Sequence, residues 1–421
     1  MIIKECKNLY VPDSYVLDLF SGSSIVSQAI FSKKMNVISN DAMQFCSDLT
    51  HCLLNISKTA RSLEYAEKGI NELQNYSLDQ KYVNPFKEII AKETLLLNNN
   101  DLEGLKELYN EIPQIGKECG NTEQINYIKE HINHSAYNKV PLVTNYYAGT
   151  YFGIGQSLRI DTIRSFIESY YLKNKDKWVY SLFLTALYNS LSLIVHSAGK
   201  HFAQPIIIND LDKSKITNQR LFENRSYDVD ILFVENINNI LSYSNKLEFE
   251  SKNISLCADI LSESFENTLK ETNISIVYAD PPYTAQQYSR FYHIPEVLHF
   301  YKYPQLQIFK GHVTQGIYPE NKFKSDFCSK RKAKEAFGNM FSLVSRLGSN
   351  LILSYSESKS KETGNERMVT MTDIDQLAQY YLPNYNIKKN HFDFEYKQLN
   401  KSDKVVKDKE DIEFLIIFEK L

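Results

Sequence analysis

The chain has 421 residues, which is enough for two or three domains and a sizeable core. Its formal net charge of -3 provides no overall attraction for nucleic acid, so such a partner would need a local basic patch. The six cysteines are scattered without a Cys-x-x-Cys pair, a pattern typical of reduced thiols rather than a disulfide framework or a metal site. Together with an N-terminus unlike a signal peptide, these features predict a cytoplasmic globular protein.

The first predicted element is a short apolar strand over Tyr15–Phe20, followed by a turn of small residues at Ser21–Ser24. A helix then begins at Ile25, with apolar residues on one face. Glycine and serines in such a turn let a ligand approach the backbone and leave helix amides available. The three spaced glycines of the dinucleotide fingerprint are absent, so the turn indicates a nucleotide-binding α/β unit only in general terms.

A second predicted strand, Asn36–Asp41, ends in an acid. An acid at the end of the second strand, roughly 20 residues beyond the turn, is where α/β folds bind ribose hydroxyls. The alternative role of Asp41 is to cap the following helix. The turn upstream favours the ribose role.

The middle of the chain is predicted to be largely helical. The stretch 42–139 is polar and predicts an inserted helical subdomain with a solvated surface. Glycines and aromatic residues at Asn145–Gly155 then open a helix and could cradle an anionic group, although a loop leading into a packed helix fits as well. The uncharged stretch Trp178–Val195 is diluted by serines and threonine, which favours a buried helix over a membrane span. From His201 to Lys252 the pattern is irregular, with Asn-rich turns expected around Ile237–Asn245.

A third strand over Ile254–Asp259 again ends in an acid, and a helix over Leu261–Leu269 leads to a buried strand at Ile274–Tyr278. Asp280, Pro281, Pro282 and Tyr283 follow this strand. Proline donates no ladder hydrogen bond and restricts the preceding residue, so the strand ends in a stiff loop.

The side chains of this loop suggest a chemistry. A carboxylate and a proline carbonyl can accept both hydrogens of an exocyclic amino group, which frees its lone pair to attack an electrophilic methyl group. Tyr283 provides a stacking face for a base removed from its helix. Catalysis would come from positioning and electrostatics, without a covalent enzyme intermediate.

The last third alternates helices and strands. We predict a strand at Leu351–Tyr355, a helix at Asp373–Tyr381 and a closing hairpin of Tyr385–Tyr396 with Glu413–Phe418, hence an α/β fold with a largely parallel sheet. Before them lies the densest basic segment, which is either a solvated surface or a phosphate contact. Its cations are Lys322, Lys324, Lys330, Arg331, Lys332 and Lys334.

These stretches resemble, in order, the adenine-N6 DNA methyltransferases of the Dam-like class that are associated with restriction–modification systems. The carrying motifs are Val16–Ser23 (VLDLFSGS), Asn40-Asp41, and Asp280–His293 (DPPYTAQQYSRFYH). Leu353–Ser356 and Glu413–Ile416 are similar to later core strands of the family. The resemblance covers both ends of the chain and hardly touches 57–139.

The resemblance implies a Rossmann-like methyltransferase fold with a helical insertion and a smaller DNA-recognition region. It implies S-adenosylmethionine as the cofactor and no metal. The implied partners are double-stranded DNA, as the substrate, and, as a possible further partner, a restriction or defence protein. The implied segments are 1–56 and 253–421 for the methyltransferase domain, 57–140 for the insertion, 141–200 for a displaced cofactor segment with core helices, and 201–252 for target recognition. The implied catalytic residues are Asp280, Pro281, Pro282 and Tyr283. The implied cofactor residues are Asp18, Phe20, Ser21, Gly22, Ser23, Asp41, Asp259, Tyr151, Phe152 and Gly153. Tyr288 and Arg290 join the basic segment as nucleic-acid contacts.

Two departures from the family pattern lead to structural expectations. Ser24 replaces the last glycine of the cofactor motif, and a left-handed backbone there would be strained. The aromatic cofactor segment, usually at the N-terminus in related enzymes, has its counterpart at Asn145–Arg164, where the helix start would hold the methionine carboxylate.

Other readings of the chain stay open at this stage. The substrate could be RNA or a protein glutamine side chain, although Asp280 in place of the Asn of the protein-modifying relatives argues against glutamine. The fold could also serve as a catalytically silent DNA-binding subunit, which Ser24 favours and the intact Asp280–Tyr283 motif does not.

Overall fold

A computed structural model describes residues 1–112, 141–199, 201–208, 215–247, 252–358, 366–392 and 411–421. The chain divides into two compact units. Unit 1 comprises 1–56, 244–289 and 323–421, and unit 2 comprises 57–243 and 290–322.

Unit 1 is built on a seven-stranded sheet in the order β3-β2-β1-β4-β7-β9-β8. Its strands are β1 (Tyr15–Asp18), β2 (Asn36–Asp41), β3 (Ile254–Cys257), β4 (Ile274–Ala279), β7 (Asn350–Ser358), β8 (Tyr385–Phe392) and β9 (Asp411–Lys420). The first five run parallel, and β9 pairs antiparallel with both β7 and β8. The predicted mostly parallel α/β sheet is confirmed, and it is consistent with a methyltransferase fold. Of the predicted closing hairpin, residues 393–396 lie outside the described part.

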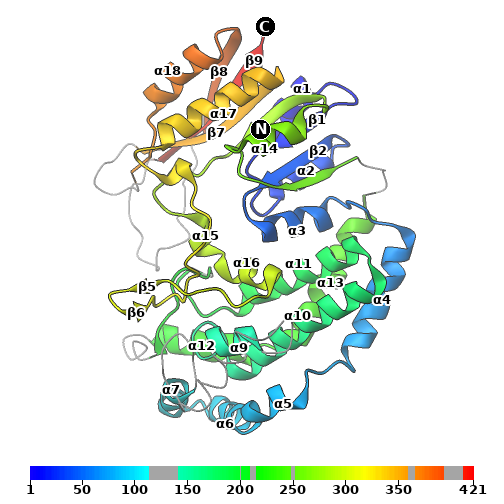
Figure 1. Cartoon of the computed structure of the whole chain (residues 1–421), viewed down its shortest axis with the longest axis vertical. Helices are drawn as coiled ribbons and strands as arrows, with labels where there is room; N and C mark the ends of the chain where they lie inside the picture. The colour runs from blue at the N-terminus through cyan, green and yellow to red at the C-terminus, as the bar shows by residue number, and fades with distance from the viewer. Residues whose placement is uncertain (113–140, 200, 209–214, 248–251, 359–365, 393–410) are drawn as a thin grey trace. The chain divides into compact units, whose positions relative to one another are not determined.

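Side chains alternate between the two faces of this sheet because the strand period is two residues. On β4, Ile276 and Tyr278 pack with α1 and α2, whereas Val277 and Ala279 pack with α14, α17 and α18. Figure 1 shows α17 and α18, in yellow and orange, beside β7, β8 and β9. The helices of unit 1 are α1 (Ile2–Leu9), α2 (Ile25–Phe31), α3 (Gln44–Leu53), α14 (Glu263–Leu269), α15 (Tyr288–Phe291, which crosses the boundary), the 3-10 turn η3 (Asp326–Cys328), α17 (Ala333–Leu347) and α18 (Met371–Tyr381).

Unit 2 is mainly helical, and its centre is formed by α10 and α11, whose side chains are buried around most of the helix. They contact each other and α4 (Figure 1). Its elements are α4 (Ala60–Leu73), α5 (Gln80–Val83), η1 (Asn84–Phe86), α6 (Lys87–Asn98), α7 (Leu102–Glu111), α9 (Leu142–Tyr147), α10 (Ile154–Asn174), α11 (Lys177–Ile194), α12 (Lys215–Ser226), α13 (Val229–Asn245), α16 (His293–Phe300), β5 (Ile308–Phe309) and β6 (His312–Val313). The predicted buried helix at Trp178–Val195 corresponds to α11. Within the described ranges, no helix has both the length and the apolar character that crossing a membrane requires.

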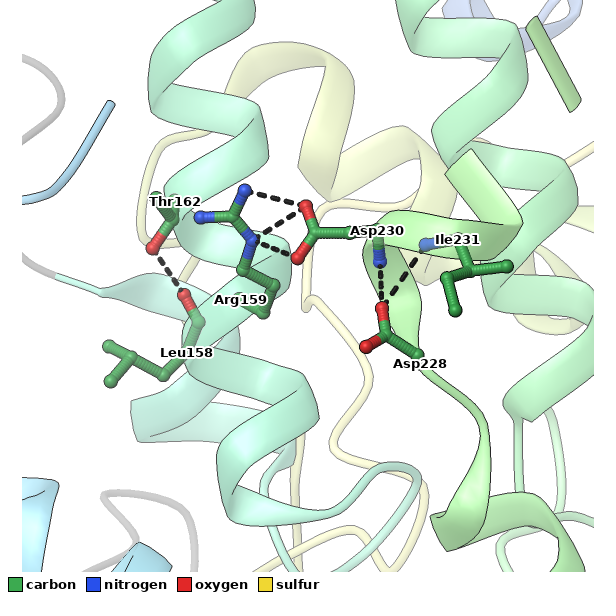
Figure 2. Close-up of polar contacts among 6 residues, drawn as sticks. All are labelled: Leu158, Arg159, Thr162, Asp228, Asp230 and Ile231. Atoms are coloured by element: carbon green, nitrogen blue, oxygen red, sulfur yellow. Dashed lines mark hydrogen bonds and ion pairs between the residues drawn. The ribbon is translucent and has the colours of Figure 1, made fainter. Parts of the chain in front are cut away.

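The expected Asn-rich turns around Ile237–Asn245 were wrong, because this stretch is the second half of α13. Val229, Phe233, Ile237 and Ile240 are all buried, at spacings of three or four residues. Burial of this apolar stripe outweighs the poor intrinsic helix propensity of asparagine. The helix is also fixed at its start, where Asp228 accepts hydrogen bonds from the amides of the first turn (Figure 2).

A short hairpin formed by β5 and β6 was not predicted from the sequence. Its two-residue turn, Lys310-Gly311, has positive φ at both positions (52° and 84°), as a type I′ turn requires. The preceding Ile308 and Phe309 are 67% and 65% exposed. The hairpin therefore carries two large apolar side chains in solvent.

Candidate active site

Acidic residues follow four neighbouring strands of unit 1 at the same edge of the sheet. Asp18 and Asp41 are the last residues of β1 and β2, Asp259 lies two residues beyond β3, and Asp280 directly follows β4. The chain moves outward from β1 to β2 and β3 and then returns to β4 on the other side of β1. In open α/β sheets, ligands bind at the carboxyl ends of strands where the order reverses in this way. The sheet thus brings the four predicted acids to one edge.

The turn after β1 is held against both neighbouring strands. The amide of Leu19 donates to the carbonyl of Tyr278 at 3.0 Å, and the amide of Ser21 donates to that of Asn40 at 2.9 Å. Asp41 Oδ2 accepts from the amide of Gly22 at 3.0 Å. Gly22 has φ +47°, and a Cβ built there would meet no atom within 4 Å. The turn is therefore fixed by its ends and open over Gly22.

Ser24, which stands where the family motif has a glycine, adopts the expected left-handed backbone, with φ 66° and ψ 12°. It is fully buried, its side chain does not cap α2, and its Oγ makes no hydrogen bond. A left-handed conformation costs a non-glycine residue about 1–2 kcal/mol. This position is therefore strained in its backbone and unsatisfied in its side chain.

Asp18 is buried, and only one of its carboxylate oxygens is bonded. The Ser27 hydroxyl donates to Oδ2 at 2.6 Å, whereas Oδ1 has no hydrogen-bond partner. Burial raises the pKa of Asp18 to about 7, the nearby charge of Asp41 adds to this rise, and the Ser27 bond opposes it. One oxygen of this buried carboxylate is therefore left without a hydrogen-bond donor.

Asp280 lies beside two groups from the strands that follow in the sheet. The Ser354 hydroxyl of β7 donates to it, which lowers its pKa, whereas the negative charges of Glu413 on β9 and of Asp18 raise it. The packed surroundings first, then Glu413 and Asp18, raise the pKa of Asp280 to about 7. Its side chain is exposed, so water weakens the effect of these charges.

The Tyr283 ring is fixed by contacts from β7 and from the segment after it. Its edge-to-face contact with Tyr355 has a centroid distance of 5.6 Å. The Arg367 guanidinium lies over the ring, 4.7 Å from its centroid. The Tyr283 carbonyl accepts from the amide of Met368 at 3.0 Å. In the motif before it, Pro281 is buried and Pro282 partly so.

A row of aromatic contacts connects the turn after β1 to the Asp280–Tyr283 loop. Phe20 contacts Phe327 at a centroid distance of 5.2 Å, Phe327 contacts Phe337 at 5.2 Å, and Phe337 contacts Tyr355 at 5.7 Å. Tyr355 in turn contacts Tyr283. Both predicted loops therefore pack on one aromatic core.

The predicted cofactor residues Tyr151, Phe152 and Gly153 lie in unit 2, and their use by a cofactor stays a prediction. Tyr151 and Phe152 are fully buried, and the Tyr151 hydroxyl donates to backbone carbonyls of the same unit. The amide of Gly153 donates to Gln156. The next two amides of α10 donate to Glu93 at 2.8 and 2.9 Å, so this chain's own carboxylate occupies the helix start. Arg159, farther along α10, pairs with Asp230 of α13 through two guanidinium nitrogens (Figure 2).

Most of the predicted DNA-contacting cations have partners within the chain. Lys330, Lys332 and Lys334 pair with acids at 2.7–3.1 Å, and Lys322 donates to Gln307. Lys324 and Arg331 are exposed. Tyr288 is also exposed, and Arg290 lies over the ring of Tyr318 at 5.1 Å. Exposed ion pairs are weak, so these residues stay predictions as DNA contacts.

Three side chains at the site had not been assigned roles from the sequence: Ser354, Glu413 and Arg367. The first two lie in predicted strands, but only the strand order places them beside Asp280. Among the described residues, no three His, Cys, Asp or Glu side chains are grouped so that they could hold a metal ion.

The fold and the site define a chain similar to adenine-specific DNA methyltransferases. Residues 238–362, which contain β3, β4, the Asp280 loop and β7, match the family model of the D12 class N6 adenine-specific DNA methyltransferases. This match agrees with the resemblance drawn from the sequence motifs.

One protein to which this chain is similar in sequence is the type II methyltransferase M.FokI of Planomicrobium okeanokoites. It is 23% identical over 332 residues, which cover 78% of this chain and 38% of the relative. The chain thus spans well under half the length of the curated relative that it matches. No solved structure matches the chain.

Proposed function

We propose that this protein transfers a methyl group from S-adenosylmethionine to the N6 amino group of adenine in DNA. The observation that carries this proposal is the position of the Asp280-Pro-Pro-Tyr283 loop directly after β4, beside the Asp18 turn at the reversal of strand order. The same loop lies within the stretch that matches the adenine-specific family.

The residues at the sheet edge fit S-adenosylmethionine. The unpartnered Oδ1 of buried Asp18 suits the ammonium group of its methionine part, and the open space over Gly22 admits a ligand against the backbone. Asp41 would bind the ribose hydroxyls, and the exposed Asp259 would bind the adenine amino group. When bound, the cofactor supplies an electrophilic methyl group on a sulfonium.

The chain's own groups would activate and position the target adenine. The Asp280 carboxylate and the Pro281 carbonyl accept the two N6 hydrogens, which makes the nitrogen lone pair available. The nitrogen would then be placed to attack the methyl group that S-adenosylmethionine supplies, with sulfur keeping the electron pair of the carbon–sulfur bond. The proton lost from N6 passes to Asp280 or to water, and a raised pKa makes this carboxylate the better acceptor.

The base must leave the duplex to reach this loop, and Tyr283 would stack on it once it is flipped out. Double-stranded DNA is therefore the proposed partner, in the cytoplasm. A cognate restriction or other defence protein is a further proposed partner, suggested by the resemblance to methyltransferases of restriction–modification systems.

The test is to incubate the purified protein with labelled S-adenosylmethionine and either unmethylated DNA or RNA, followed by nucleoside analysis. We expect the label in N6-methyladenine from DNA. If the label appears only in RNA, the substrate is RNA and not DNA. Cofactor binding without transfer to either would instead support a catalytically silent subunit.

A further inference from the structure

The side-chain amide of Asn40 joins three segments at the carboxyl edge of the sheet. Asn40 lies next to Asp41 on β2 and is buried, with 1% of its surface exposed. Its Nδ2 donates to the carbonyl of Leu19 at 3.2 Å and to the carbonyl of Ala258 at 3.0 Å. Its Oδ1 accepts from the amide of Ala258 at 3.2 Å. One side chain therefore connects β2 with the turn after β1 and with the segment that leads from β3 to Asp259.

This link lies where the main-chain pairing of the edge strand ends. β3 is at the edge of the sheet, so β2 is its one neighbouring strand, and their pairing reaches Asp41 and Cys257. Beyond it, the amide of Ala258 also donates to the carbonyl of Asp41 at 3.0 Å. The Asn40 side chain bonds both the N–H and the C=O of Ala258, as a residue of a neighbouring strand would. It thus extends the pairing of β3 by one residue, up to Asp259.

The two residues that follow Asn40 and Ala258 in the chain are both acids, Asp41 and Asp259. These are the acids that would bind the ribose and the adenine of the cofactor. The Asp259 carboxylate accepts from the amide of Leu261 at 3.0 Å, which is a bond within its own segment. The bonds between Asn40 and Ala258 instead join the Asp259 segment to the strand that carries Asp41.

We propose that Asn40 is a positioning residue for the cofactor: it holds the Asp259 segment against β2 and the turn after β1, and thereby sets the spacing of the two acids. This role rests on the proposed function and deepens it. Asn40 acts through Asp41 and Asp259, because its own amide is bonded to the backbone. A ligand held by two groups binds more weakly when their spacing is not fixed beforehand, since binding must then also order them.

The experiment measures how tightly Asn40→Ala binds S-adenosylmethionine and 5′-methylthioadenosine, which keeps the adenosine part and lacks the amino-acid part. Because Asn40 acts on the adenosine end, we expect both ligands to bind about 10-fold more weakly. At saturating cofactor, kcat on DNA should stay close to the wild-type value. Asp18→Ala should in contrast weaken the binding of S-adenosylmethionine alone, since Asp18 would bind the ammonium group of the methionine part.

Asn253→Ala is the matched control, because Asn253 makes a similar link at the amino end of the same two strands. Its Oδ1 accepts from the amide of Val37 at 2.8 Å, and its Nδ2 donates to the carbonyl of Leu54 at 3.1 Å. Asn40 and Asn253 are both buried, so both alanine variants should lower the thermal midpoint. The positioning role would be overturned by an equal loss of affinity in Asn253→Ala. It would also be overturned if Asn40→Ala bound both ligands normally, or lost affinity for S-adenosylmethionine alone.

A second variant and a second measurement cover the case in which Asn40→Ala does not fold. Asn40→Ser keeps one donor and one acceptor on a shorter side chain, and should weaken the binding of both ligands in the same way. Hydrogen exchange needs no ligand. It should increase over Ala258–Ser262 in the Asn40 variants and stay at the wild-type level there in Asn253→Ala. Unchanged exchange over this stretch would overturn the proposal. If the wild type binds neither ligand, the proposed function fails, and the exchange result decides whether Asn40 orders the Asp259 segment.

Discussion

Buried acids are used differently in the two units. In unit 2, Asp161 accepts hydrogen bonds on both oxygens, from the amides of Val143 and Thr144 and from the hydroxyls of Thr144 and Tyr301. Glu93 likewise accepts on both oxygens. In unit 1, Asp18 has one oxygen without a partner.

The difference separates structural acids from candidate ligand-binding acids. A buried carboxylate whose acceptor positions are filled by the chain stabilises the fold, because removing it leaves several donors unsatisfied. A carboxylate with an unfilled oxygen, or one that is exposed at a strand end as Asp280 and Asp259 are, retains bonding capacity for a ligand. The two kinds should therefore respond in opposite ways to substitution.

The largest expected effect comes from Asp280→Ala. It removes the acceptor for the target amino group, so transfer to DNA should fall by about 10³-fold or more. Cofactor affinity and the thermal midpoint should stay close to the wild-type values, because Asp280 is exposed. Single-turnover methylation and cofactor titration measure the two quantities.

Asp161→Ala is the matched substitution in unit 2. It leaves two amides and two hydroxyls without their acceptor, and we expect a loss of about 3 kcal/mol or more in the free energy of unfolding. A variant that folds normally but loses activity would contradict the structural role of Asp161. Turnover by Asp280→Ala at the wild-type rate would remove Asp280 from its proposed role.

The pH dependence should show an intermediate effect. Asp280 must be ionised to accept the N6 hydrogens, and its surroundings raise its pKa above the ordinary value of a carboxyl group. Activity should therefore begin to fall at a higher pH than the titration of an ordinary carboxyl group would cause. Glu413→Gln removes a neighbouring negative charge, so the ionised form of Asp280 becomes more favourable and the acid limb should move to lower pH.

The measurement is kcat/KM on DNA between pH 5 and 9 for the wild type and Glu413→Gln, and the control is Glu419→Gln. Glu419 lies at the other end of β9, where it pairs with Lys388. An acid limb that stays in place in Glu413→Gln would show that Glu413 does not influence the Asp280 carboxylate.

Local patterns predicted the parts of this site that depend on a short stretch of chain. A β-branched run ended by two prolines indicates a strand followed by a stiff loop wherever it occurs, and this predicted the Asp280 loop. The acids that end the predicted second and third strands can likewise be recognised from the local sequence. Ser24 stood out because the motif around it is short and continuous.

The rest depends on contacts between distant residues. Glu413 lies 133 positions after Asp280, and it acts there only because β9 is next to β7 in the sheet. The start of α10, which the sequence suggested as a site for an anion, is occupied by Glu93, 61 residues before Ile154 in the chain. The Asn-rich half of α13 was misassigned because its propensity is weak and its buried stripe is formed by tertiary packing.

The smallest expected effect concerns the strained end of the turn after β1. Ser24→Gly relieves the left-handed backbone and removes a buried hydroxyl without a partner, while glycine adds flexibility to the unfolded chain. The net gain should be about 1 kcal/mol, or about 2–4 °C in the thermal midpoint of a unit of this size. Calorimetry of Ser24→Gly and Ser24→Ala separates the contributions, since alanine removes the hydroxyl and keeps the strain.

Lys34→Gly is the matched control, because Lys34 has φ +64° and an exposed side chain. If Ser24→Ala and Ser24→Gly both weaken cofactor binding, the buried hydroxyl contributes to cofactor binding.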